Sequence, residues 1–388
     1  MAEITSFVAT EFARFAAHTP LTANVLRAIP SLKAFASMAF WVNLIACDSS
    51  RERTVLRSDP DGGCPNCVIQ LKPLARLGSP FDSVSPVYES EAVRAADSTF
   101  WVAPTDHPGL LAAYSAVGSF IRTAGVRGTG PGEFSDWLKV ALTSGDTVSV
   151  IDIAQARRTL IDTEGRAIRI HPLPAATRGL ASSQRRLFAQ ADIRSPELIG
   201  KPIHELNAQG DIIASFGDVG IYRQHELDGV RPIGPARDGG LWAAVPNRYE
   251  ILHFDSALSR IDTIRVDVRW FPPNQWMGNF LAEPPEPRIV SIRESEDGLV
   301  WLIIRVKDIN WQADDTQRER LITMDLLQRA FDWRIEVVDP IAKRRLGGQQ
   351  YDEMLFSGVG DGLIYARFEG EDGRVYLTAY KSSFQKGR

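Results

Sequence analysis

The residues from 125 to 134 are the first whose types and spacing could do chemistry, because they include four glycines and a proline. Glycine-rich loops cradle phosphates when they join a strand to a helix, with an acidic residue about 20 residues further on. Here two short apolar runs follow instead, residues 138–142 and 147–151, separated by a Ser-Gly-Asp turn. No amphipathic helix follows. We therefore expect a tight crossing between two sheets, not a phosphate loop.

A second candidate is the Cys-x-x-Cys pair Cys64 and Cys67. Such a pair serves as a redox centre, half of a zinc site or a structural disulfide. Zinc needs two further ligands, and the six histidines are scattered along the chain. A thioredoxin-type pair lies where a strand meets a helix, whereas an alternating run follows here. An oxidising compartment favours a local disulfide, which we expect to pin the start of the fold; redox and metal roles are the alternatives.

Other catalytic or cofactor signals are weak. The sequence contains no Gly-x-Ser-x-Gly elbow, His-Glu-x-x-His helix or Walker loop, so no catalytic residue is predicted. Acidic residues fall mainly in predicted turns, and calcium binding stays open although no EF-hand-like spacing occurs. We expect no other cofactor. Trp270, Trp276 and Trp311 lie in or near loops and are candidates for a ligand-facing rim, with core packing as the alternative.

Composition limits the class of protein and its partners. The 388 residues are 44% hydrophobic and include 30 glycines and 23 prolines, as in a folded protein with many turns. The net charge of −4 is spread along the chain, so the basic footprint of a nucleic-acid-binding protein is absent. We expect the partner to be an envelope protein or a small-molecule ligand.

The N-terminal region has the order of a lipoprotein signal. An apolar stretch, residues 34–46, follows Arg27 and Lys33 and is too short to span a bilayer. It ends in Leu-Ile-Ala-Cys47, which resembles a bacterial lipobox, in which the cysteine is lipidated and becomes the new N-terminus. A buried helix is the alternative. Because about 30 residues precede the apolar core, more than a usual basic region has, we expect the true start nearer Val25.

The order of these segments predicts three parts: a leader (1–47), a tether containing the Cys-x-x-Cys pair (48–66) and a folded body (67–388). It places the protein in the bacterial cell envelope, on the periplasmic or surface side. A lipid anchor at Cys47 is then its only attachment to the membrane.

The body contains a repeated strand. An apolar run with an aromatic residue at one position recurs at intervals of about 40 to 65 residues, the size of a propeller blade. Two copies, at Ser149 and Phe188, are weaker. The pattern predicts an all-β, six-bladed β-propeller, in which Trp101, Trp242 and Trp301 pack on predicted inner strands. The six equivalent positions are Trp101, Ser149, Phe188, Trp242, Trp301 and Tyr365.

The stretch 125–165 looks like an NHL-type repeat, and residues 64–388 are similar to bacterial six-bladed propeller lipoproteins of the TolB-like/NHL group. Those proteins likewise open with a Cys-x-x-Cys strand and a Leu-Gly turn, here Leu77-Gly78, and carry a Glu-Val-x-Asp-Pro-like segment, here 336–340. The resemblance implies a fold but no catalytic residues, because the group mostly lacks an assigned activity.

The resemblance also suggests how the ring closes. The last repeat supplies only three strands, at 354–357, 363–368 and 375–380, whereas a blade has four. Residues 68–77 are expected to be the fourth, so that an N-terminal strand closes the propeller and removes two open sheet edges. A charged insertion at 312–320, followed by a short helix within 321–331, departs from the blade pattern.

The function expected from these features is that of a binding or interaction module with an unknown ligand, more a binder than an enzyme. Ligands would approach the axial channel or the loop rim. The alternative is a metal-dependent propeller hydrolase or lyase, similar to a lactonase, which would hold its metal in the channel by inward-facing carboxylates, asparagines or histidines.

Overall fold

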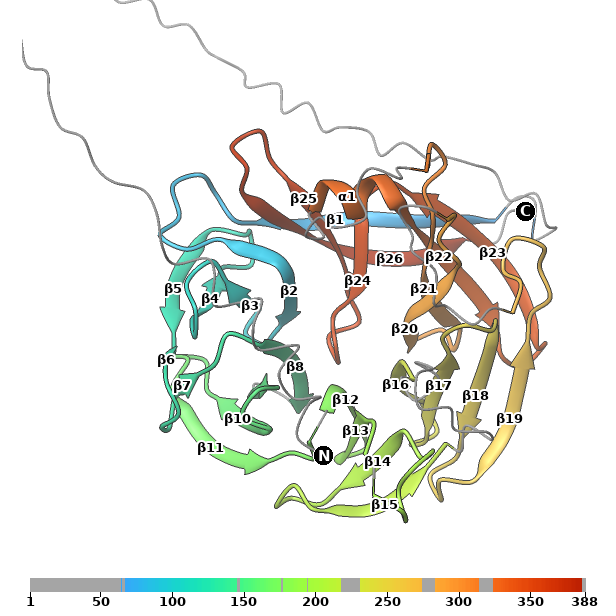
Figure 1. Ribbon diagram of the computed structural model, residues 1–388, viewed down its shortest axis with the longest axis horizontal. Helices are drawn as coiled ribbons and strands as arrows, with labels where there is room; N and C mark the ends of the chain where they lie inside the picture. The colour runs from blue at the N-terminus through green and yellow to red at the C-terminus, as the bar shows by residue number, and fades with distance from the viewer. Residues whose placement is uncertain are drawn as a thin grey trace, which may run out of the picture. The chain divides into compact units, whose positions relative to one another are not determined.

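The computed structural model describes residues 64, 67–144, 147–175, 177–193, 195–217, 231–273, 283–313 and 324–385. The leader, Cys47 and most of the tether lie outside this set. The described residues form six four-stranded antiparallel sheets, a two-stranded parallel ribbon and the short helix α1 (Met324–Ala330). Each four-stranded sheet is one blade of a β-propeller, as the sequence predicts (Figure 1).

The strands fall into four positions within the blades. The first strands lie nearest the axis (Figure 1) and are β2 (Pro86–Arg94), β8 (Leu138–Ser144), β12 (Thr177–Ser183), β16 (Ile233–Pro235), β20 (Arg288–Glu294) and β24 (Met354–Ser357). The second strands are β3 (Phe100–Thr105), β9 (Thr147–Asp152), β13 (Arg186–Ala191), β17 (Leu241–Val245), β21 (Val300–Lys307) and β25 (Ile364–Glu369). The third strands are β4 (Leu111–Tyr114), β10 (Arg157–Ile161), β14 (Ile203–Leu206), β18 (Glu250–Phe254), β22 (Phe331–Asp339) and β26 (Val375–Gln385). The outermost strands are β5 (Phe120–Ala124), β11 (Ala167–Pro172), β15 (Ile212–Phe216), β19 (Arg260–Arg265), β23 (Arg344–Tyr351) and β1 (Val68–Leu77). We number the blades 1 to 6 in the order of their first strands.

Blade 6 is completed by the strand that comes first in the chain. β1 pairs antiparallel with β26, from Val68 opposite Gln385 to Leu77 opposite Leu377. In Figure 1 the blue β1 lies along the red β26. The predicted closure by residues 68–77 is therefore confirmed, and β26 has a partner strand on both edges.

The core consists of seams between blades. Each of the six hydrophobic clusters in the described part of the chain draws its buried residues mainly from two neighbouring blades. All six equivalent positions of the repeat lie on second strands. In five blades this position is aromatic, and its side chain packs in the seam with the following blade. These residues are Trp101, Phe188, Trp242, Trp301 and Tyr365.

The tryptophans expected to pack on inner strands, Trp101, Trp242 and Trp301, lie on second strands, each between a first and a third strand. A second strand has a neighbour on each edge and seams on both faces, so its sequence is almost continuously apolar. A first strand borders the centre of the ring instead and carries polar residues among its apolar ones. Its apolar run is therefore harder to recognise in the sequence than that of a second strand.

The weak copy in blade 2 has a physical explanation. Ser149 is fully buried, and its hydroxyl accepts a hydrogen bond of 2.8 Å from Nε of Arg158 on the adjacent strand β10. Burial lowers the pKa of the Arg158 guanidinium to about 10. A polar pair thus occurs in this blade where the others have an aromatic ring.

The glycine-rich string forms the crossing from blade 1 to blade 2. It contains the two short strands β6 (Val126–Arg127) and β7 (Glu133–Phe134). Gly125 has φ +86°, and a Cβ there would come within 2.6 Å of the buried Phe134 ring. The carboxylate of Glu133 accepts a hydrogen bond of 2.8 Å from the Gly130 amide. The string therefore serves backbone geometry, as its sequence context predicts.

A buried charge cluster joins blades 4 and 5. The carboxylate of Glu336 on β22 has no exposed surface and accepts hydrogen bonds from Arg334 and Arg345 of blade 5. From the turn between β17 and β18 in blade 4, the Tyr249 hydroxyl donates to it over 3.0 Å. Burial, followed by the nearby Glu336 carboxylate, raises the pKa of Tyr249 well above its usual value, so this hydroxyl keeps its proton. Because an unpaired buried carboxylate is costly, these donors must stay in place.

Closure predicts that deleting residues 64–77 unfolds or aggregates the protein, because β26 and the seam between blades 6 and 1 lose their cover. Size-exclusion chromatography and thermal melting measure this outcome. A gentler pair of variants lies within β1. Leu77→Ala, at a fully buried side chain, should cost about 2–5 kcal/mol, whereas Leu74→Ala, at a side chain 37% exposed, should cost much less. A soluble deletion form with unchanged melting would refute the closure.

The charge cluster predicts a sharp contrast between adjacent glycines of β23. A Cβ on Gly348 would lie 1.8 Å from Oε1 of Glu336, whereas a Cβ on Gly347 meets nothing within 4 Å. We expect Gly348→Ala to lower the free energy of unfolding by about 2–4 kcal/mol through overpacking and a disturbed ion pair. Gly347→Ala should change it by less than about 1 kcal/mol. Equal effects in denaturant titrations would contradict this account of Glu336.

Candidate functional site

A cavity of about 690 Å³ opens where several first strands begin. The residues around it come from the starts of first strands, from the ends of second strands and from the segments next to both. A further region of about 300 Å³ continues along the first strands and shares part of the same lining. We call the two regions together the channel, and the larger one its mouth. This volume suits a small molecule. The shared lining residues are Lys139, Arg178, Gln190, Pro232 and Val290.

Two of these lining side chains come from irregular strands. In β12 the register with β13 shifts between Thr177 and Gly179, which leaves Arg178 as the extra residue. In β20 the register with β21 shifts between Ile289 and Ser291, which leaves Val290 as the extra residue. Such a bulge re-aims the extra side chain. Arg178 and Val290 are both exposed and both line the cavity.

An ion pair crosses from blade 1 to blade 2 along the channel wall. Nζ of Lys139 on β8 lies 2.5 Å from Oε1 of Glu91 on β2, and the two side chains are 31% and 25% exposed. Asp136, just before β8, lies at the cavity rim and pairs with Arg127 over 3.2 Å. The two carboxylates of the lining thus each have a basic partner.

Gln190 fixes the wall between blades 3 and 4. Its buried side-chain amide satisfies both backbone groups of Arg231 when its nitrogen faces the Arg231 carbonyl (3.2 Å) and its oxygen faces the Arg231 amide (3.1 Å). The next residue, Pro232, lines the cavity. Gln190 is therefore a positioning residue for this part of the wall.

The tryptophans proposed from the sequence as rim residues lie elsewhere where they are described. Trp270 is half-buried in the seam between blades 4 and 5, with ring centroids 6.0 Å from Tyr249 and 5.7 Å from Phe271. Trp311 is half-buried against the seam between blades 5 and 6. Neither is among the residues lining the cavity. Trp276 lies outside the described residues.

One tryptophan at the cavity was not predicted from the sequence. Trp137 precedes β8, lines the cavity and is 63% exposed. Its signal in the sequence is its place directly after the glycine-rich crossing, where the chain turns into a first strand. Lys139 could have been noticed as well, because it is a charged residue in the otherwise apolar run 138–142.

A carboxylate next to the channel wall holds the segment that carries Trp311. Asp332 at the start of β22 accepts hydrogen bonds from the Ile309 amide (3.2 Å) and the Gln350 side chain (2.6 Å). Burial raises the pKa of Asp332 to about 6, since desolvation outweighs these two donors. Its neighbour Trp333 borders the deeper part of the channel.

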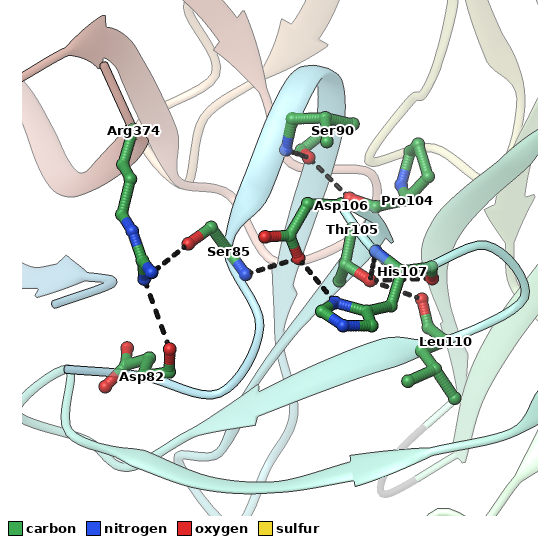
Figure 2. Close-up of polar contacts among 10 residues, drawn as sticks. Asp82, Ser85, Ser90, Pro104, Thr105, Asp106, His107, Leu110 and Arg374 are labelled. Atoms are coloured by element: carbon green, nitrogen blue, oxygen red, sulfur yellow. Dashed lines mark hydrogen bonds and ion pairs between the residues drawn. The ribbon is translucent and has the colours of Figure 1, made fainter. Parts of the chain in front are cut away.

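A polar cluster at the joint of blades 6 and 1 contains a serine, a histidine and an aspartate, the residue types of many hydrolases (Figure 2). Oδ1 of Asp106 lies 3.0 Å from Nδ1 of His107, but Ser85 contacts this carboxylate through its backbone amide (2.7 Å). The Ser85 hydroxyl accepts a hydrogen bond of 3.1 Å from Arg374 in blade 6. A catalytic triad needs the histidine on the serine hydroxyl. The contacts instead tie the segment between β1 and β2 to both blades.

A separate cavity of about 450 Å³ lies between blades 4 and 5 and is rich in carboxylates. Trp242 and His253 stack within it at 4.0 Å, and Glu294 accepts a hydrogen bond of 2.8 Å from the Trp242 indole. Within the described part of the chain, no group of three or more His, Cys, Asp or Glu residues could hold a metal ion.

The cysteines proposed as a disulfide are joined in the structure. Cys64 and Cys67 have Sγ atoms 2.06 Å apart and Cα atoms 5.2 Å apart. The Cys64 amide donates a hydrogen bond of 2.7 Å to the Leu346 carbonyl on β23. This contact attaches the chain before β1 to the outermost strand of blade 5. Cys47, the proposed lipidation site, lies outside the described residues.

Comparison with known proteins gives likeness in structure alone. No protein-family model matches the sequence, and no curated protein matches it. A crystal structure of a candidate exported protein from Bacteroides fragilis is similar at 12% identity and a TM-score of 0.54, covering 84% of this chain and 98% of that one. A member of the DUF4221 family from Bacteroides vulgatus is similar at 10% identity and a TM-score of 0.53, covering 81% and 98%.

Virginiamycin B lyase from Staphylococcus aureus is also similar, at 11% identity and a TM-score of 0.44, covering 81% of this chain and 99% of that one. A likeness at this level carries no argument about activity. Among the described residues, no helix is both long and apolar enough to cross a bilayer. The two stronger likenesses show the fold that the strands themselves establish, a β-propeller.

Proposed function

We propose that this protein is a lipid-anchored, extracytoplasmic β-propeller of the TolB-like/NHL kind that binds a small molecule at the mouth of its axial channel. The single observation that carries the binding function is the cavity of about 690 Å³ at the starts of the first strands. Its lining combines an apolar surface with a few polar groups whose positions are set by strands and bulges, as in small-molecule sites.

The proposed location rests on the sequence order at the N-terminus and on the disulfide. A basic residue, an apolar stretch, a small residue and Cys47 follow one another as in a lipoprotein signal. The Cys64–Cys67 bond suits an oxidising compartment. The similar protein from Bacteroides fragilis is itself described as a candidate exported protein.

Mass spectrometry of the protein from its native membrane tests the anchor. We expect an N-terminal, acylated Cys47 and loss of membrane association in Cys47→Ser, because the acyl chains supply the attachment. An intact Met1 N-terminus, or a Cys47 without acyl chains, would contradict the anchor and leave the binding site untouched.

Filling the channel mouth tests the binding function. Val290→Trp places a large ring at a residue that lines the cavity and is 39% exposed. Ile261→Trp is the matched control on the outermost strand β19, where the side chain is 54% exposed. In a thermal-shift screen of neutral, anionic and cationic small molecules, we expect compounds that stabilise the wild type and Ile261→Trp but not Val290→Trp.

The screen contradicts the proposal if no compound stabilises the wild type, or if every stabilising compound acts equally on Val290→Trp. Elemental analysis of the purified protein addresses the enzyme alternative. Stoichiometric calcium or zinc there would favour a metal-dependent hydrolase or lyase over a binding module.

A further inference from the structure

Basic side chains outnumber carboxylates on the channel wall. Four basic side chains line the two cavity regions, against the two carboxylates of Glu91 and Asp136. Glu91 pairs with Lys139 inside the channel, and Asp136 pairs with Arg127 at the rim. The other basic residues of the lining are three arginines, Arg178, Arg288 and Arg305.

Arg178 is the member of this set that is available to a ligand. It is exposed, it is the extra residue of the β12 bulge, and it lines both cavity regions. Its guanidinium makes no hydrogen bond or ion pair with any residue that the structure describes. A guanidinium at a concave surface presents a planar set of donors that matches a carboxylate.

Two further arginines add to the field around this position. Arg288 on β20 lies directly opposite Arg305 on β21. Arg305 lies over the Phe331 ring, with its guanidinium carbon 4.1 Å from the centroid. Each of these two arginines lines a cavity region that Arg178 also lines, so both add positive charge to the same wall.

The rest of the mouth is apolar. The exposed Trp137 ring and the exposed Val290 side chain border the same cavity as Arg178. Pro104, Ile153 and Pro232 complete this apolar side. A ligand that filled the cavity would therefore need a non-polar body as well as a negative charge.

We infer that the channel mouth binds a small amphipathic anion, with its acidic group on Arg178 and its apolar body against Trp137 and Val290. This inference rests on the proposed binding function and specifies its ligand class. A neutral compound of the same shape gains the apolar contacts but loses the charge-assisted hydrogen bonds.

A matched pair of probes tests the charge requirement. 2-Naphthoate and 2-naphthamide share one ring system and differ in charge. In titration calorimetry with the full chain, we expect 2-naphthoate to bind at least tenfold more tightly than 2-naphthamide. Arg178→Gln should weaken 2-naphthoate at least tenfold and leave 2-naphthamide unchanged. Arg169→Gln, at an exposed arginine on the outermost strand β11, is the control and should leave both affinities unchanged.

Three results would overturn the inference: no binding of 2-naphthoate, equal affinities for the two probes, or an Arg178→Gln variant that binds 2-naphthoate as the wild type does. Thermal melting of Arg178→Gln checks that the variant is folded. If Val290→Trp blocks neutral or cationic compounds while 2-naphthoate fails to bind, the channel mouth is a binding site and only its preference for anions is wrong.

Discussion

The seam between blades 6 and 1 has to be built from the two ends of the folded chain, and every other seam depends on it. A loop of about 300 residues must close before β1 can pair with β26, at an entropic cost of about 5 kcal/mol. Burying the side chains of Leu77, Tyr365 and Leu377 in this seam offsets that cost, since each large apolar side chain contributes roughly 1.5–3 kcal/mol. Polar contacts then tie the connection between β1 and β2 to both blades.

The features that the sequence predicted correctly are those in which one physical cause dominates several neighbouring residues. Second strands are buried on both faces, and in five blades they carry an aromatic residue into the next seam, so four of the six repeats were clear apolar runs and the Phe188 copy was a weaker one. The Ser149 copy was weak because a buried serine–arginine pair occurs there instead. The missing fourth strand of blade 6 pointed to β1, whose pairing with β26 is as expected.

The lining of the channel was not predictable in the same way. Arg178 and Val290 reach the cavity because of single-residue bulges, and a bulge in a short first strand leaves no periodic signal. Trp270 and Trp311 lie between elements far apart in the sequence, so their half-buried positions depend on tertiary packing that loop composition does not show. Trp137 was the cavity residue that the sequence came nearest to indicating, because it directly follows the crossing between blades 1 and 2.

Closure holds the first strands in a ring, and the ring forms the cavity. Native-state hydrogen exchange tests that dependence most directly. If closure holds the ring together, the amides that pair β1 with β26 should open with the same free energy as those of the buried second strands β9 and β13, as one cooperative unit. If β1 and β26 separate several kcal/mol more easily while β9 and β13 stay protected, the ring does not depend on its closure and the account is wrong.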